Sequence, residues 1–376
     1  MGSQVLGFAI LLVAAGMTVA LPNKSMDQMD VPAIFVFGDS TADVGTNNHL
    51  KTVFRADFPY YGIDFDLSKA TGRFSNGYNT IDEISMLLGF HQSPSPYLSL
   101  ASDQSTFKKN IFLGANFASA GSGILDSTGS QLGVIPMRQQ VEQFRLVRNS
   151  MMEVIGATAT SGLLSKSLFI ITAGGNDIID YFKSNMTTIS QQDYMESIIS
   201  NYTAHLTNLH IMGARKFGVI SSPPVGCLPS VRLQANLTLP GSGCQEGINE
   251  YARGFHGMLT GLLRGLSSDL NGMVYSLGDV YNMTITMMQD PLAFGFTNVE
   301  EACCGGGRLN AETRCLAMQY PSPNVCKDRG AYLFWDSYHP TEHACKLAAK
   351  TLVGAGLAFV APMNFGQLAQ TKVQDE

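Results

Sequence analysis

Short apolar runs alternate with longer segments of helical periodicity along the chain. Five of these runs are apolar almost throughout, at residues 33–37, 111–117, 168–172, 217–221 and 273–277. Strands without polar alternation are typical of parallel sheets whose two faces are both covered by helices. The pattern therefore predicts a doubly wound α/β sandwich with a mainly parallel, five-stranded sheet.

Three segments show clear helix signals. Ser190, followed three residues later by Asp193, resembles a capping box and predicts a helix running towards Met212. Apolar residues recur on one helical face between 248 and 266, and residues 341–358 predict a final helix. No linker or internal repeat divides the chain, so we expect one domain over 32–361 and a polar tail at 362–376. The clearest insertions are 49–79 and 300–328.

The N-terminus has the pattern of an export signal. An apolar run at 5–15 is followed by small residues at Thr18 and Ala20, which predicts a signal peptide at 1–20 and a short extension at 21–31. An uncleaved anchor is the alternative, but the run is short for a bilayer span. No later run is long and apolar enough to span a membrane, and the polar C-terminus has no lipid-anchor signal.

Glycosylation sequons and cysteines agree with export. The pattern Asn-X-Ser/Thr occurs at Asn23, Asn185, Asn201, Asn236 and Asn282. In a secreted chain the cysteines predict disulfides, with candidates Cys227, Cys244, Cys303, Cys304, Cys315 and Cys326. Seven cysteines leave one unpaired, and we expect it to be Cys345, which stands alone in the predicted final helix. We therefore expect an extracellular glycoprotein.

Composition excludes one class of partner. The formal net charge is -6 and the hydrophobic fraction is 45%. Binding nucleic-acid phosphates requires clustered Lys and Arg, so we expect no nucleic-acid partner.

The first candidate catalytic residue is Ser40, which follows Gly38 and Asp39 directly after the first predicted strand. Catalytic groups gather at the carboxyl ends of the strands in such a sheet, so Ser40 is a candidate nucleophile. An Asp-Ser helix cap is the alternative.

A second motif supplies a candidate base. Asp336 lies three residues before His339, so its carboxylate can accept the Nδ1 hydrogen of the imidazole and leave Nε2 to take a proton from a serine. His343 follows at helical spacing and raises the alternative of a zinc pair. A catalytic zinc needs a third ligand, and no HExxH pattern is present, so we expect no metal and assign His343 to a helix surface.

Two glycine-rich segments end predicted strands and could present hydrogen-bond donors to an oxyanion, at 116–123 and 172–177. Glycine exposes a backbone N–H, and the Asn176 side chain adds another donor. An ordinary glycine turn is the alternative for each. All four motifs fall where this fold would place a site.

These motifs together resemble the GDSL esterases/lipases of the SGNH hydrolase superfamily, of the plant type. The blocks lie at 37–40, 116–121, 174–177 and 335–341, with secondary matches at 72–77, 223–229 and 302–305. The resemblance covers residues from about 32 to about 361. Its motifs are specific in their order and spacing.

The resemblance implies a flavodoxin-like α/β/α fold and ester hydrolysis through an acyl-enzyme, with no cofactor. Ser40 would be the nucleophile, His339 the general base and Asp336 its partner. Ser40, Gly121 and Asn176 would form the oxyanion hole, with Gly123 as the alternative to Gly121. It also implies that Cys227 pairs with Cys244 and that the cysteines at 303–326 pair among themselves.

The chain departs from the family pattern at Thr41, where the motif has Leu, and at Thr46, where plant members often have Asn. We expect both to reshape the lip of the pocket. An α/β-hydrolase is excluded because no serine stands in a G-x-S-x-G elbow.

The expected protein is a monomeric secreted hydrolase of the apoplast or cell wall. Its substrate would be a lipid, acetylated-glycan or phenolic ester. An acyltransferase using the same acyl-enzyme and a non-catalytic binding glycoprotein stay open as alternatives.

Overall fold

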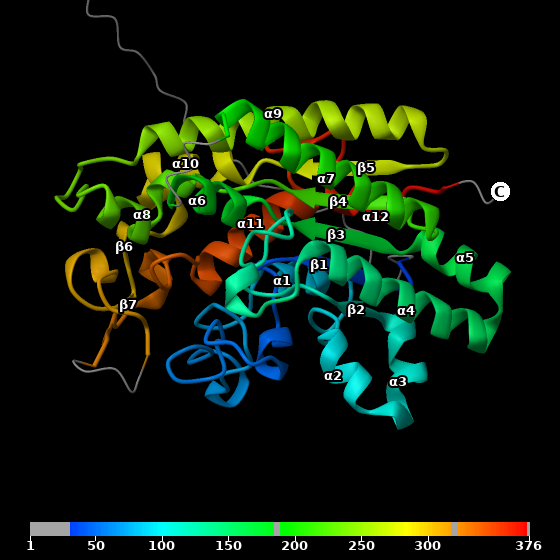
Figure 1. Ribbon diagram of the computed structural model, residues 1–376. Coiled ribbons are helices and arrows are strands. Elements are labelled where there is room, and N and C mark those ends of the chain that lie inside the picture. The colour runs from blue at the N-terminus through cyan, green and yellow to red at the C-terminus, as the bar shows by residue number, and fades with distance from the viewer. Residues whose placement is uncertain (1–30, 184–188, 317–321, 374–376) are drawn as a thin grey trace, which may run out of the picture.

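The computed structural model describes residues 31–183, 189–316 and 322–373 (Figure 1). The predicted signal peptide at 1–20, most of the predicted extension, and the sequons at Asn23 and Asn185 lie outside these ranges. Within them, no helix combines the length and hydropathy that a bilayer crossing requires.

The central sheet confirms the predicted α/β class. In the described residues it has six strands in the order β10-β5-β4-β3-β1-β2, and all neighbours are parallel except β10, which runs antiparallel to β5. Its strands are β1 (Ile34–Gly38), β2 (Gly114–Asn116), β3 (Leu168–Thr172), β4 (Lys216–Ile220), β5 (Val274–Gly278) and β10 (Val360–Ala361). The five predicted strands are all present. The second is shorter than expected, because 111–113 forms a 3-10 turn, and the edge strand β10 was not predicted.

Among the described residues, four short strands lie outside the central sheet and pair as β6 with β9 and β7 with β8. They are β6 (Asn298–Ala302), β7 (Cys304–Gly305), β8 (Asn324–Val325) and β9 (Tyr332–Phe334). The helices are α1 (Thr80–Leu87), α2 (Tyr97–Ser102), α3 (Gln104–Asn110), α4 (Met137–Ile155), α5 (Ala157–Lys166), α6 (Gly175–Lys183), α7 (Gln191–Ile211), α8 (Pro229–Gln234), α9 (Glu246–Asp269), α10 (Val280–Gln289), α11 (Glu342–Gly354) and α12 (Phe365–Gln370).

Helices cover both faces of the sheet, which explains why its strands are apolar throughout (Figure 1). On one face, Phe35 and Phe169 lie opposite each other on neighbouring strands, and Phe144 of α4 packs against both rings. Side chains alternate between faces along a strand. Phe217, which is paired with Phe169, therefore lies on the same face as Phe169. The next residue, Gly218, faces the other side of the sheet, where Phe365 of α12 packs against it. Helix α7 adjoins α4 and α9, and helix α11 adjoins α1 and α12.

The predicted helices are present with one correction. Ser190 caps α7 by accepting the N–H of Asp193 at 3.0 Å, and α9 contains the predicted apolar face. The final predicted helix ends at Gly354 rather than at 358.

The expectation of a polar tail from residue 362 is wrong for 365–370. This segment forms α12, and its Phe365 and Leu368 are fully buried. Its apolar positions are too few to reveal a helical period.

The seven cysteines all lie in the described ranges. Disulfides join Cys227 to Cys244, Cys303 to Cys326, and Cys304 to Cys315, and the buried Cys345 is free as predicted. The last two bridges tie together the insertion that precedes β9.

We predict that α12 contributes substantially to stability. Phe365→Ala should lower the free energy of unfolding by about 3–5 kcal/mol, because it leaves a cavity over Gly218. Gln370→Ala, at an exposed position of the same helix, should change it by less than about 0.5 kcal/mol. Urea denaturation of both variants checks this. Equal stability of the two variants would show that 362–376 behaves as a tail.

Candidate active site

The expected site residues come from loops at the carboxyl edge of the sheet. β1 pairs with β2 on one side and with β3 on the other, so the chain reverses its winding direction between β1 and β3. Open α/β sheets form a crevice at such a switch point. Ser40 follows β1 by two residues and Asn176 lies in the first turn of α6 after β3, so the two flank this crevice.

The turn before Ser40 depends on Gly38. Its φ is 149°, and a Cβ atom there would lie 2.1 Å from the carbonyl oxygen of Thr172, so a larger residue cannot occupy the position. The buried Gln140 of α4 accepts the Gly38 N–H and donates to the Gly38 carbonyl, each at 2.9 Å. The backbone leading to Ser40 is therefore held on both sides.

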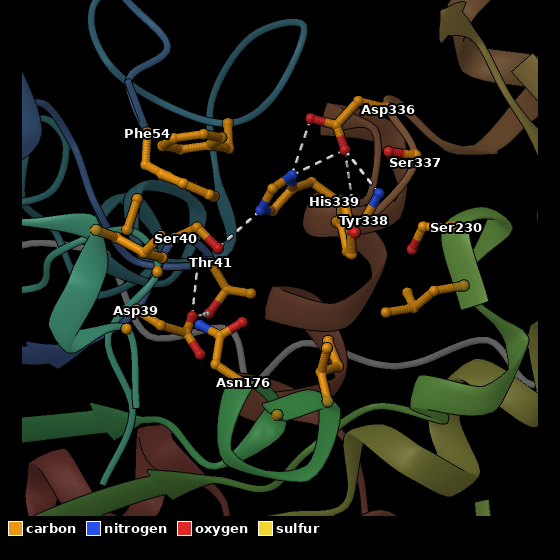
Figure 2. A pocket seen from close by; sticks show the side chains of 18 of the residues that line it. Asp39, Ser40, Thr41, Phe54, Asn176, Ser230, Asp336, Ser337, Tyr338 and His339 are labelled. Atoms are coloured by element: carbon orange, nitrogen blue, oxygen red, sulfur yellow. Dashed lines mark hydrogen bonds and ion pairs between the residues drawn. The ribbon is translucent and has the colours of Figure 1, made fainter. Parts of the chain in front are cut away.

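The structure brings Ser40, His339 and Asp336 into one hydrogen-bonded chain (Figure 2). Ser40 Oγ lies 2.7 Å from His339 Nε2. His339 Nδ1 lies 2.8 Å and 2.9 Å from the two carboxylate oxygens of Asp336. With a proton on Nδ1, Nε2 is free to accept the Ser40 hydrogen.

Several donors hold the Asp336 carboxylate in its ionised form. Burial by itself would raise its pKa, but His339, the Tyr61 hydroxyl and the Tyr338 N–H together lower the pKa below its ordinary value. The N–H groups of Tyr338 and His339 both donate to Oδ1 at 2.8 Å. Tyr61 donates to Oδ2 at 2.6 Å.

A small second core surrounds Asp336 and His339. The Phe74 ring lies 4.8 Å from the His339 ring, and Tyr61 packs edge-on against Phe74 and Trp335. The four cysteines of the two bridges around 303–326 belong to the same cluster. The pair is therefore supported by the insertions at 49–79 and 300–328, rather than by the central sheet.

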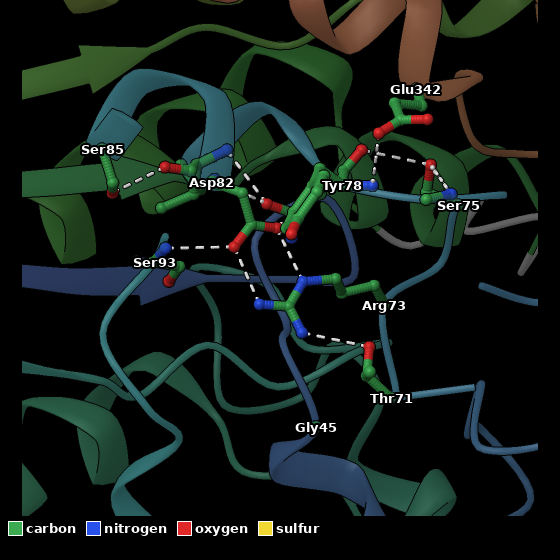
Figure 3. Close-up of polar contacts among 12 residues, drawn as sticks. Gly45, Thr71, Arg73, Ser75, Tyr78, Asp82, Ser85, Ser93 and Glu342 are labelled. Atoms are coloured by element: carbon green, nitrogen blue, oxygen red, sulfur yellow. Dashed lines mark hydrogen bonds and ion pairs between the residues drawn. The ribbon is translucent and has the colours of Figure 1, made fainter. Parts of the chain in front are cut away.

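A buried ion pair anchors the first of these insertions (Figure 3). Arg73, next to Phe74, binds both carboxylate oxygens of Asp82 in α1 at 2.6 Å and 2.7 Å. Asp82 also accepts the N–H groups of Asn79 and Ser93, so its charge is fully partnered. The Tyr78 N–H donates to Glu342 at the start of α11.

The backbone N–H groups of Ser40 and Gly121, both in the pocket wall, have no partner in the part of the chain that the structure describes. Their neighbours are all used, because the N–H groups of Asp39, Thr41, Ala120 and Ser122 each donate within the protein. The Asn176 amide nitrogen gives one hydrogen to the Ser122 carbonyl at 2.9 Å and keeps the other. The N–H groups of Ser40 and Gly121 and the remaining Asn176 hydrogen are therefore available to a ligand oxygen.

The geometry favours Gly121 over Gly123 as the third expected donor. Gly121 lines the pocket. Gly123 instead lies against Asp177, where a Cβ atom would be 2.5 Å from the carboxylate. Asp177 accepts the N–H groups of Ile124 and Leu125, and burial raises its pKa to about 6.

The site opens into a pocket of about 710 Å³. Its lining includes the apolar side chains of Phe54, Phe58, Leu132, Ile179, Leu228 and Leu233. Thr41 lines the pocket as expected, and its hydroxyl donates to the buried Asp39. The same expectation for Thr46 is wrong, because Thr46 is fully buried and does not line the pocket.

His343 is half-buried rather than a surface residue. Its Nε2 lies 2.9 Å from the carbonyl oxygen of Phe294, and its ring packs against Phe296. Within the described ranges, no group of three or more His, Cys, Asp or Glu side chains is placed to hold a metal ion.

Sequence reasoning missed Tyr61 and Gln140. Tyr61 is 275 residues away from Asp336 and Gln140 is 102 residues away from Gly38. Tyr61 stands in an irregular insertion and Gln140 is one of several polar residues in a helix, so neither carries a local motif.

Comparison with known proteins gives one consistent result. The family model described as GDSL-like Lipase/Acylhydrolase matches residues 34–352. The chain is 35% identical over 373 residues to GDSL esterase/lipase At4g28780 of Arabidopsis thaliana, covering 98% of each protein. It is also 35% identical to GDSL esterase/lipase APG of the same plant, covering 94% of this chain and 98% of that protein.

We predict that Tyr61→Phe destabilises the protein in a pH-dependent way. Loss of the donor to Asp336 should lower the free energy of unfolding by about 1–2 kcal/mol at pH 7. A carboxylate with a lowered folded-state pKa stabilises the protein above its unfolded-state pKa of about 3.9, and this contribution is lost as pH falls through the folded-state value. The difference in free energy of unfolding between Tyr61→Phe and wild type should therefore become smaller below roughly pH 4.

Urea denaturation at several pH values measures this difference. Tyr60→Phe is the matched control, because it removes the neighbouring hydroxyl, which lies outside the Asp336 site. A pH-independent difference, or an equal loss in Tyr60→Phe, would contradict the assigned role of the Tyr61 hydroxyl.

Proposed function

The chain belongs to the GDSL-like lipase/acylhydrolase family, and from this membership and the geometry of its pocket we propose that it hydrolyses carboxylic esters through an acyl-enzyme on Ser40. The observation that carries the proposal is the hydrogen-bonded chain from Ser40 Oγ through His339 to Asp336. The N–H groups of Ser40 and Gly121, which have no partner among the described residues, belong to the wall of the same pocket. A nucleophile, a base and oxyanion donors are the groups that acyl transfer needs.

In the first half-reaction, Ser40 Oγ attacks the ester carbonyl carbon while His339 Nε2 takes the serine proton. Asp336 holds the ring by Nδ1 and stabilises the imidazolium that forms. The N–H groups of Ser40 and Gly121 and the Asn176 amide stabilise the negative charge on the former carbonyl oxygen. Collapse releases the alcohol, which receives the proton from His339.

In the second half-reaction, His339 takes a proton from a water molecule, which attacks the acyl carbonyl. The same donors stabilise the second tetrahedral intermediate. Collapse releases the carboxylic acid and returns the proton to Ser40 Oγ.

The pocket supports a substrate with an apolar group beside the ester. The apolar side chains named above are part of its lining, and no cofactor takes part in the proposed chemistry. Lipid and phenolic esters supply such a group, whereas acetylated glycans place the smaller acetyl group there. A panel of these three ester classes identifies the substrate class by comparison of kcat/KM.

We also propose that the protein is secreted to the apoplast or cell wall. Three disulfides support this, because such bridges persist in oxidising compartments. The described sequons Asn201, Asn236 and Asn282 are all exposed. Asn236 lies in the turn after α8, whereas the other two lie on helices, so it is the most accessible acceptor. Assay of apoplastic fluid after expression of a tagged chain tests the location.

We predict that Ser40→Ala abolishes catalysis without unfolding the protein. Wild type should hydrolyse a short-chain nitrophenyl ester and become labelled at Ser40 by a fluorophosphonate. Ser40→Ala should lower kcat/KM by about 10⁴-fold or more and take no label, with an unchanged far-UV spectrum. Ser102→Ala, a surface serine of α2 outside the pocket, should behave as wild type. Unlabelled wild type, or a labelled Ser40→Ala protein, would refute the mechanism.

A further inference from the structure

The peptide group between Ala120 and Gly121 is held from one side. Asn47 Nδ2 donates to the Ala120 carbonyl oxygen at 2.9 Å. In a planar trans peptide, the carbonyl and the following N–H point in opposite directions. Fixing the Ala120 carbonyl therefore fixes the direction of the Gly121 N–H, which lines the pocket and has no partner among the described residues.

The backbone itself does not impose this orientation. Gly121 has a φ of 86°, and glycine tolerates both signs of φ. Rotation of the peptide group before a glycine therefore meets little steric resistance, and a side-chain contact has to select one orientation.

Asn47 is itself held rigidly. It is 1% exposed, and its Oδ1 accepts the Ser119 hydroxyl at 2.6 Å, which sets the amide so that Nδ2 faces Ala120. Nδ2 also donates to the Phe54 carbonyl at 2.7 Å. The Ala120 N–H is held separately by Asp43 at 3.0 Å.

We propose that Asn47 is a positioning residue that directs the Gly121 N–H at the oxyanion by binding the carbonyl on the opposite side of the same peptide group. The inference rests on the proposed esterase function and assigns a role to a side chain that does not touch the substrate. Because the donor acts on charge that develops in the transition state, loss of Asn47 should lower kcat more than it raises KM.

The contact with Phe54 predicts a different signature. Phe54 lines the pocket, so an Asn47 that served only to hold this wall would affect substrate binding. Its loss would then raise KM and leave kcat unchanged. The split between kcat and KM therefore separates the two roles.

The experiment compares Asn47→Ala with Asn48→Ala. Asn48 is the matched control, because it stands in the same turn and its amide also donates to a backbone carbonyl, that of Thr71, at 2.9 Å. Asn47→Ala should lower kcat for a short-chain nitrophenyl ester by roughly 10- to 100-fold, with KM within about threefold of wild type. Asn48→Ala should keep kcat within about twofold.

A transition-state analogue gives a second readout. A trifluoromethyl ketone forms a hemiketal with the serine and places an oxyanion among the donors. Its Ki should rise in Asn47→Ala by the same factor as kcat/KM falls. If Asn47→Ala does not fold, Asn47→Asp keeps the size and the acceptor for Ser119 but removes both donors, and the same losses are expected.

The outcomes separate this inference from the proposed function. Wild type without turnover or fluorophosphonate labelling would overturn both. Active wild type would overturn the inference alone if the kcat of Asn47→Ala matched that of Asn48→Ala, or if only KM rose. A kcat loss paralleled by the loss of analogue affinity would support it.

Discussion

Buried carboxylates need hydrogen-bond donors, and this requirement organises the whole carboxyl edge of the sheet. A carboxylate taken out of water without donors costs several kcal/mol, so each one selects the loop conformation that supplies them. Four buried carboxylates of the described residues lie along this edge, after β1, in the first turn of α6 and in the turn before α11: Asp39, Asp43, Asp177 and Asp336. Asp43 accepts N–H groups of its own turn and of Ala120 in the loop after β2. Asp177 accepts the N–H groups of Ile124 and Leu125 and the hydroxyl of Thr128. Loops distant in sequence are thereby held at fixed positions around Ser40.

These carboxylates and the nearby carbonyls accept many of the N–H groups around Ser40, but not every N–H group of the described pocket wall has a partner. Those of Ser40 and Gly121 each lie between neighbours that donate within the protein. Donors fixed in this way need no rearrangement when charge develops on a substrate oxygen, and such preorganisation is usually the largest contribution to catalysis of acyl transfer. The same network that stabilises the loops therefore leaves the chemical groups of the proposed mechanism available.

The sequence revealed the parts of the protein that depend on local pattern. The apolar runs predicted the five parallel strands, and the rule for strand ends placed Ser40 and Asn176 at one crevice. Elements built from few residues could not be predicted from the sequence. Strand β10 has two residues and helix α12 has six, so both are too short to show a period. Contacts between residues far apart in the chain could not be predicted either. Tyr61 reaches Asp336 only because an irregular insertion folds back, and no spacing in the chain encodes that contact.

The two halves of the proposed catalytic machinery rest on different cores. Ser40 follows a strand of the central sheet, whereas Asp336 and His339 follow β9 and are enclosed by the disulfide-linked second core. The 2.7 Å contact between Ser40 Oγ and His339 Nε2 therefore depends on how the two cores are joined.

Insertion 49–79 connects the two cores. Its Arg73 binds Asp82 of α1 beside the sheet, and its Asp64 pairs with Arg329 before β9. The same insertion supplies Tyr61 to the acid and Phe54 to the pocket wall. One irregular segment thus sets the distance between nucleophile and base and also shapes the space for substrate, so a change in this segment alters both together.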